Sequence, residues 1–220
     1  MHQKWGRSSW RNLIEPASHY ARAGIPVHQR VAVDWAEDME NLNDPDAQRF
    51  YLDDGKPYRA GQIFALPALA EAFDLIAEYG REGFYQGPVA EDILSKLKSL
   101  GGHHQAADFA AIQAQEVQPI YTTYRGKTIW ECPPNGQGIT TLIMARLCER
   151  YDFNAMSDAD FIHVLAEISK QAYGLRDHFL ADPEYARVSV DWLLSDAVID
   201  KAAAQIDMAK ASAFQVSDFP

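Results

Sequence analysis

The sequence has only two cysteines, Cys132 and Cys148, among its 220 residues. Two thiols cannot form the disulfide framework of a small secreted protein, and no Cys-x-x-Cys pair or histidine-rich spacing indicates a metal site. No apolar run approaches the roughly 20 residues that a membrane-spanning helix needs. The first residues also lack the apolar stretch of a secretory signal peptide. A cytoplasmic location is therefore favoured if the N-terminus is genuine, and we expect no metal or other cofactor.

Basic residues are scarce too: 20 Lys and Arg stand against 31 Asp and Glu, which gives a formal net charge of −11. An acidic surface of this kind argues against nucleic acid and against anionic membrane as partners. Hydrophobic residues make up 47% of the chain. That fraction is typical of a globular protein, and the length is enough for one good-sized core or two small ones.

The most informative stretch runs from residue 119 to residue 152. Its first part, residues 119–132, is rich in β-branched and aromatic side chains, which favour strands. Gly126 interrupts it and can adopt the positive φ of a tight turn, so a β-hairpin is predicted there. The prolines and the Asn-Gly pair of residues 133–138 then end the second strand. A helix is predicted from Ile139 onward.

Helices account for most of the remaining sequence. The longest begins after Ser157, a fair N-cap, and ends before Asp182. Its apolar stripe is spaced by three and four residues, and we expect Phe161, Leu165, Ile168 and Leu175 to be core residues. Residues 58–64 are predicted to be irregular. The other predicted helices cover residues 9–23, with Leu13, Ala17 and Tyr20 on the apolar side, 31–42, 67–79, 89–100 and 195–206. The fold class is therefore helix-rich α+β.

Several motifs, taken together, resemble the gamma-glutamyltransferase family of N-terminal-nucleophile hydrolases. The first is Tyr124-Arg125-Gly126, then a short strand, then the Pro-Pro-Asn-Gly-Gln-Gly sequence of residues 133–138 before a helix. Others follow the family's order: residues 24–27 (Gly-Ile-Pro-Val), residues 83–87 (Gly-Phe-Tyr-Gln-Gly) and Asp182-Pro183. The resemblance covers nearly the whole chain and places it in the C-terminal part of the large subunit. One departure is Leu175, where the family usually has an acidic residue before Arg176.

The resemblance implies a fold. In that family the large and small subunits together form a four-layer αββα sandwich, and residues 1–220 would be a single partial domain of it. This chain would supply outer-layer helices and a hairpin, without the catalytic small subunit. Residues 211–220 resemble the loose tail before the family's cleavage site. A helical face left uncovered by a missing sheet invites association.

The resemblance also implies a chemistry. A threonine at a newly exposed N-terminus attacks a gamma-glutamyl amide, and its own α-amino group serves as the base. Water or an amino acid then resolves the acyl enzyme, as in glutathione metabolism. The threonine would lie outside this chain, so the expected partner is a complementary small-subunit chain that carries it. The chain alone is expected to be inactive. Because residues 133–138 look more like the branch that includes acylase-like relatives, the substrate stays open between gamma-glutamyl and related acyl amides.

We assign no catalytic, substrate-binding or metal-binding residue within the chain. The family's Thr-Thr-His signature is absent, since Thr122-Thr123 lies in a predicted strand and Thr140-Thr141 begins a predicted helix. The family's substrate-binding arginine precedes the matched region. The remaining candidates are interpreted as structural or solvated: Arg125, Arg146 and Arg176 as surface or structural cations, His103-His104 as a solvated loop, Cys132 as a small buried residue, Asp152, Asp158 and Asp160 as charges at helix ends, and Glu37, Asp38 and Glu40 as an exposed helix face.

Two classes of function remain open from the sequence. The chain is either a segment of a gamma-glutamyltransferase-like enzyme, active only with the rest supplied, or a truncated, non-catalytic interaction module or inactive fragment. Neighbouring reading frames would discriminate between them, because a frame that opens with Thr-Thr-His favours a split enzyme.

Overall fold

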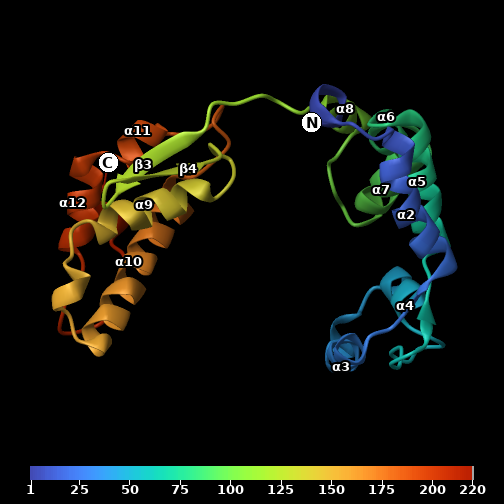
Figure 1. The fold of residues 1–220 in the computed structure, drawn as a ribbon, viewed down its shortest axis with the longest axis horizontal. Coiled ribbons are helices and arrows are strands. Elements are labelled where there is room, and N and C mark those ends of the chain that lie inside the picture. The colour runs from blue at the N-terminus through green and yellow to red at the C-terminus, as the bar shows by residue number, and fades with distance from the viewer. Residues whose placement is uncertain (220) are drawn as a thin grey trace. The chain divides into compact units, whose positions relative to one another are not determined.

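The computed structural model describes residues 1–219, and the chain divides into two compact units, Met1–Ala114 and Gln115–Pro220. Figure 1 colours them from blue at the N-terminus to red at the C-terminus. The sequence leads us to expect residues 1–220 to be a single partial domain of a larger fold, and each of the two units can be described by itself. Within the described residues, no helix is long and apolar enough to cross a membrane.

The first unit is mostly helical. Its longest helices are α2 (Trp10–Ala23), α5 (Pro67–Tyr79) and α7 (Gly87–Ser99). Ser9 caps α2 by accepting a hydrogen bond from the Asn12 amide at 3.3 Å, as its position in the sequence predicts. The shorter helices are α1 (His2–Trp5), α3 (Gln29–Glu37), α4 (Pro45–Tyr51), α6 (Glu82–Tyr85), α8 (Ala106–Ala111) and a 3-10 turn (Met39–Asn41).

Helix α2 packs on α5 through a face that the sequence did not predict. The expected apolar side is open to solvent, with Leu13 51% and Tyr20 60% exposed. The side that faces α5 instead carries Ser18, whose hydroxyl lies 2.5 Å from Asp74 Oδ1. Arg22 contacts the other oxygen of Asp74, also at 2.5 Å. Trp10, at the start of α2, also donates its indole N–H to the Ile76 carbonyl of α5 at 2.7 Å, so polar contacts join the two helices on this face.

Two short strands were missed. β1 (Ile25–Pro26) pairs antiparallel with β2 (Ile63–Phe64), inside the segment predicted to be irregular. Two residues are too few to display a strand's alternation, so no period marks them in the sequence. The helix expected over residues 31–42 is also divided: α3 ends at Glu37, and the 3-10 turn follows.

The second unit sets the predicted hairpin against helices. β3 (Ile120–Tyr124) and β4 (Lys127–Glu131) pair antiparallel, with Thr122 opposite Ile129. The two-residue turn has φ of 46° at Arg125 and 73° at Gly126, which is the left-handed geometry of a type I′ turn. The helices are α9 (Gly138–Cys148), α10 (Asp158–Phe179), α11 (Val190–Leu193) and α12 (Asp196–Ala204), with 3-10 turns at Phe153–Ala155 and Val216–Asp218.

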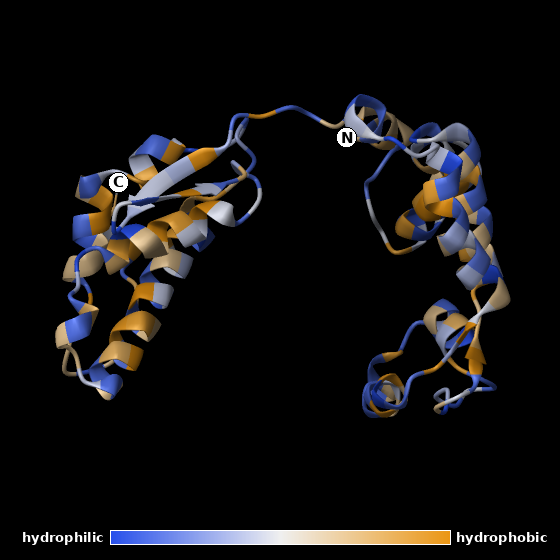
Figure 2. Cartoon of the chain, viewed as in Figure 1, coloured by the Kyte–Doolittle hydropathy of each residue, from blue (hydrophilic) through white to orange (hydrophobic). Residues whose placement is uncertain are grey.

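The core of this unit lies between α9, α10 and α12. Apolar residues, orange in Figure 2, recur along these helices. On α10 the predicted core residues Ile168 and Leu175 are fully buried, but Phe161 is 39% exposed and Leu165 is only half-buried. Val164 takes the buried position in the first half of the helix. The stripe read from spacing was therefore one residue out of register at that end.

The segment expected to be a loose tail is described as far as residue 219. Ser212 is hydrogen-bonded to Glu167 of α10, and Phe219 is 8% exposed within the core cluster. These contacts hold the described part of the segment against α10.

Candidate functional site

The hairpin of the family-like stretch has one covered face and one open face. Side chains alternate along β3, so Thr122 is buried while Tyr121 is exposed. Tyr121 lies opposite Trp130 in the register, and their ring centroids are 4.6 Å apart. Each of these two side chains is 57% exposed. The open face therefore presents an aromatic pair, which the alternation along the two strands indicates but which was not among the predicted candidate residues.

A groove of about 460 Å³ follows the outer edge of β3. In a two-residue hairpin, the residues beside the turn are a hydrogen-bonded pair, and bonded and non-bonded pairs then alternate. Tyr121 and Thr123 therefore direct their backbone N–H and C=O groups away from β4, toward this edge. The groove is lined by Pro119, Ile120, Tyr121, Thr122, Thr123, Arg146, Val190, Asp191 and Leu194.

Two polar groups lining the groove have no hydrogen-bond partner among the described residues: Thr122 Oγ1 and Arg146 Nε. Thr122 is 4% exposed, so its hydroxyl has little access to water. The other end of Arg146 is paired, because its Nη2 lies 2.6 Å from Asp196 Oδ1. Buried polar groups are nearly always hydrogen-bonded in native proteins, but Thr140 Oγ1 and both side-chain polar atoms of Gln171 also lack partners among the described residues, so these two groups do not by themselves mark a binding site.

The carboxylate of Asp196 joins two helices through arginines. Arg150 contacts it at 2.8 Å, and Arg150 also contacts Asp200 at 2.7 Å. The hydrogen bond from Arg150 and the charge of Arg146 lower the pKa of Asp196. This network fixes α12 on α9, so Arg146 has a structural role, whatever else its free Nε contacts.

The other two arginines singled out in the sequence also have local partners. Arg125 lies over the rings of Tyr124 and Phe153, at 5.4 and 5.8 Å from their centroids. Arg176 pairs with Asp177 at 2.6 Å and donates to the Gln137 side chain at 2.8 Å. The residue after Arg176, Asp177, thus supplies the charge partner, whereas the family usually has its acidic residue before the arginine, where this chain has Leu175.

Both threonine pairs are built into regular structure. Thr122 and Thr123 lie within β3. The Thr140 amide donates to the Gln137 carbonyl at 2.9 Å in the first turn of α9, and its hydroxyl is buried without a partner among the described residues. The nitrogen of such an internal threonine is a peptide amide and cannot act as a base.

The two cysteines differ in environment. Cys132 is exposed, so the expectation that it is a small buried residue was wrong. It follows β4 directly, where the chain leaves the hairpin. Cys148 is half-buried, and burial raises the pKa of its thiol. A raised pKa disfavours the reactive thiolate, so Cys148 is poorly suited to nucleophilic chemistry.

The remaining candidates lie on the surface. His103 and His104 are exposed, and no group of three or more potential metal ligands occurs among residues 1–219. Asp152 accepts a hydrogen bond from the Asn154 amide at 3.1 Å, and Asp160 contacts the Ser157 hydroxyl at 2.7 Å. Asp158 lies in the first turn of α10, and Glu37, Asp38 and Glu40 are exposed.

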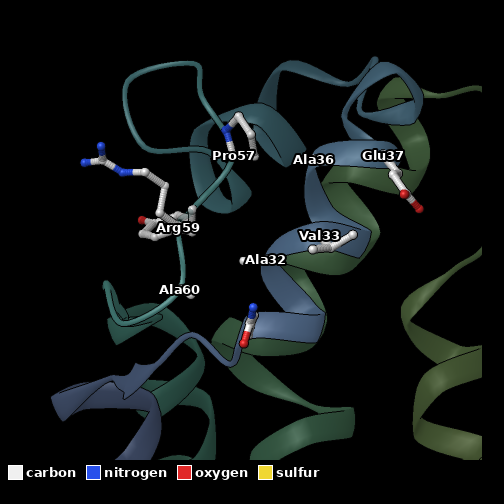
Figure 3. Close-up of a pocket in the computed structure, with 9 residues that line it drawn as sticks. Ala32, Val33, Ala36, Glu37, Pro57, Arg59 and Ala60 are labelled. Atoms are coloured by element: carbon white, nitrogen blue, oxygen red, sulfur yellow. The ribbon is translucent and has the colours of Figure 1, made fainter.

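The first unit has an open groove of about 550 Å³ (Figure 3). Helix α3 forms one wall with Ala32, Val33 and Ala36, and the segment from Pro57 to Ala60 forms the other. Its walls are mainly apolar. Arg59 and Glu37 extend away from the centre in Figure 3, and Gln29 and Tyr58 complete the lining.

Comparisons with known proteins give a consistent answer. Residues 1–219 match the family model described as Gamma-glutamyltranspeptidase. The Glutathione hydrolase-like YwrD proenzyme of Bacillus subtilis is 33% identical over 93% of this chain and 39% of the relative. The Oxamate amidohydrolase proenzyme of Klebsiella pneumoniae is 32% identical over 91% of this chain and 38% of the relative. The crystal structure of Helicobacter pylori gamma-glutamyltranspeptidase aligns with a TM-score of 0.82 and 29% identity, over 94% of this chain and 61% of that chain.

The chain thus spans less than two fifths of the length of these curated relatives. The family model covers all the described residues, and so it includes both units as far as residue 219. The chain belongs to the gamma-glutamyltranspeptidase family, and its helix-rich α+β structure shares the N-terminal-nucleophile hydrolase fold of that family's solved members.

Proposed function

We propose that this chain is a segment of an enzyme that transfers or hydrolyses gamma-glutamyl or related acyl groups, through a threonine that lies outside the sequence. The observation that carries the proposal is the family match over residues 1–219. Support comes from Thr122 and Thr140, because neither has the free amino group that an N-terminal nucleophile uses as its base. The chain alone is then inactive.

In this proposal the chain contributes helices and the β3–β4 hairpin to the fold of the active enzyme, and it supplies no catalytic residue. The hydroxyl oxygen of the missing threonine attacks the acyl carbonyl, and the threonine's own α-amino group takes the hydroxyl proton. The amine of the substrate then leaves with that proton. The α-amino group of the threonine has a reference pKa of roughly 7.7–8.0, which suits proton transfer near neutral pH. Water or an acceptor amine then resolves the acyl enzyme. No residue of this chain is assigned a step in that sequence.

The proposed partner is a complementary chain that carries the threonine and completes the sheet. The outer edge of β3 supports this, since Tyr121 and Thr123 offer backbone groups there to a further strand. The open aromatic pair of Tyr121 and Trp130 fits a second sheet stacked on the hairpin.

The substrate is proposed only as a class. The relatives' names include a glutathione hydrolase-like protein and an oxamate amidohydrolase, and both describe cleavage at an amide carbonyl. We therefore propose a small acyl amide, with gamma-glutamyl amides as the first choice.

The test is an assay with a chromogenic gamma-glutamyl anilide. The purified chain alone should release no chromophore above background. Co-expression with the complementary chain from the same genome should give activity, and replacing that chain's first threonine with alanine should abolish it. Turnover by the chain alone that a substitution within this chain removes would overturn the proposal. Absence of both complex and activity would favour a non-catalytic interaction module.

A further inference from the structure

Residues 212–219 lie against α10, and we call this segment the strap. Its first contact is with Glu167, a carboxylate that is only 2% exposed. Glu167 Oε2 accepts hydrogen bonds from the Ser212 amide at 3.1 Å and from the Ser212 hydroxyl at 2.6 Å. Its Oε1 lies 2.5 Å from Lys170 Nζ, which also donates to the Ser212 carbonyl at 2.7 Å. The amide, hydroxyl and carbonyl of one serine are thus all bound by two neighbouring side chains.

The second contact of the strap is made by Phe214, whose ring fills a gap beside Gly174. Gly174 lies inside α10, where glycine is unfavourable relative to alanine. A Cβ at this position would meet Cγ of Phe214 at an impossible 2.2 Å. The aromatic ring therefore occupies the space that the missing side chain leaves. This explains a glycine in mid-helix that no turn requires.

Further contacts hold the strap after Phe214. The Gln215 amide donates to Gln205 Oε1 at 2.9 Å, and Gln205 Nε2 donates back to the Gln215 carbonyl at 3.0 Å. Phe214 stacks on Phe219 with centroids 5.5 Å apart. Phe219 in turn lies 6.2 Å from the ring of Phe179 on α10.

We propose that α10 carries a peptide-binding site for an extended segment with a serine and, two residues later, a phenylalanine, and that the strap is its resident and releasable ligand. The contacts are those of a recognition site, because the buried carboxylate of Glu167 and the partly exposed ammonium of Lys170 bind one residue, and the gap at Gly174 admits another. The strap contains one 3-10 turn and no strand, so few backbone bonds tie it to the unit. Segments with few backbone hydrogen bonds open locally while the rest of a unit stays folded, and opening of the strap withdraws Phe219 from the core cluster. The inference does not rest on the proposed function.

The site makes the strap a built-in competitor of other peptides. Because it is tethered, its effective concentration is high, and a free peptide of the same pattern binds only when the strap is weakened. Phe214→Ala weakens the strap and leaves Glu167, Lys170 and Gly174 in place. Gly174→Ala fills the gap while favouring the helix, so it closes the site without weakening α10.

The first measurement is amide hydrogen exchange of the full chain, followed by NMR. The Ser212 and Gln215 amides should be protected in the wild type, and Phe214→Ala, Gly174→Ala and Glu167→Gln should each speed their exchange about tenfold or more. Core amides of α9 should keep their wild-type rates. Two controls are matched: Ala166→Gly lowers helix propensity on α10 at an exposed site, and Glu184→Gln neutralises an exposed carboxylate. Unchanged protection in Gly174→Ala, or equal loss in Ala166→Gly, would overturn the inference.

The second measurement is binding of a labelled synthetic peptide with the sequence of residues 211–219. It should bind the full-length Phe214→Ala variant measurably and the wild type much more weakly. The double variant Phe214→Ala/Gly174→Ala should not bind it, and a scrambled peptide should bind none of the three. Binding that persists in the double variant, or no binding to Phe214→Ala, would show that α10 carries no such site.

Discussion

At the scale of single residues, Glu167 is the group whose surroundings alter its chemistry most clearly. Burial raises its pKa, whereas the hydrogen bonds and charge from Lys170 and the hydrogen bonds from Ser212 lower it, and the net pKa is lowered. A carboxyl with a lowered folded pKa stabilises the fold above its unfolded pKa of roughly 4.3. That contribution is lost as the pH falls through the folded value.

We therefore expect acid to loosen the strap through Glu167. Between about pH 6 and pH 3, the free energy of unfolding of the wild type should fall more steeply than that of Glu167→Gln, which has no charge to lose. Urea denaturation at a series of pH values measures this difference. The exposed Glu184→Gln variant serves as the control and should follow the wild type. Parallel curves for wild type and Glu167→Gln would contradict the assignment.

A second residue-scale prediction concerns the corrected register of α10. Ile168 is fully buried, so Ile168→Ala should lower the free energy of unfolding by about 2–5 kcal/mol. Leu165 is half-buried, and Leu165→Ala should cost less than half as much because fewer packing contacts are lost. Chemical denaturation of both variants under one set of conditions decides the point. If the two substitutions lower the free energy of unfolding equally, Leu165 is a core residue and the apolar stripe predicted from the sequence is correct at this end of α10.

At the scale of elements, sequence patterns predicted those helices whose ends are marked locally. Residues 67–79 were predicted to be helical, and α5 has these bounds, because Pro67 opens the first turn and Gly80 ends it with a φ of 62°. The β3–β4 hairpin follows equally from local residues. β1 and β2 could not be predicted, since each is two residues long and pairs across a large sequence separation.

The candidate site was only partly predictable for the same reason. The sequence located the hairpin and the motif loop and indicated that both threonine pairs lie in regular structure. The groove along β3 depends on Arg146 from α9 and on Val190 and Asp191 beside it, which no local pattern brings together. Gly174 is a similar case. A glycine is needed there because the ring of Phe214 packs against it, and no pattern within α10 predicts that contact.

The hairpin turn offers a prediction for a whole element. Gly126 has a φ of 73°, a region that β-branched residues rarely adopt. Gly126→Val should lower the free energy of unfolding by about 1–2 kcal/mol, because the turn must strain or change type. Lys127→Val is the matched control: it introduces the same side chain one residue later, in an exposed strand position that favours valine. Thermal denaturation of the two variants compares them, and equal melting temperatures would mean that the type I′ turn does not set the stability of the hairpin.

At the scale of the whole molecule, the open aromatic face of the hairpin decides how the isolated chain behaves. Tyr121 and Trp130 lie side by side and are each 57% exposed, next to a strand edge with unpaired backbone groups. Apolar patches and bare strand edges both promote association. The net charge of −11 opposes association through repulsion, and this repulsion weakens as salt screens it.

The isolated chain should therefore self-associate with rising concentration, and more strongly in high salt. Size-exclusion chromatography with light scattering measures the mass at each condition. The double variant Tyr121→Thr/Trp130→Thr should stay monomeric over a wider range, because it removes the aromatic pair while threonine still favours a strand. Tyr185→Ser, at a position that is 80% exposed in a loop, removes one aromatic elsewhere and should associate like the wild type. The hairpin face is not the associating surface if the wild type is monomeric under all conditions, or if the mass of the Tyr185 variant falls as much as that of the double variant.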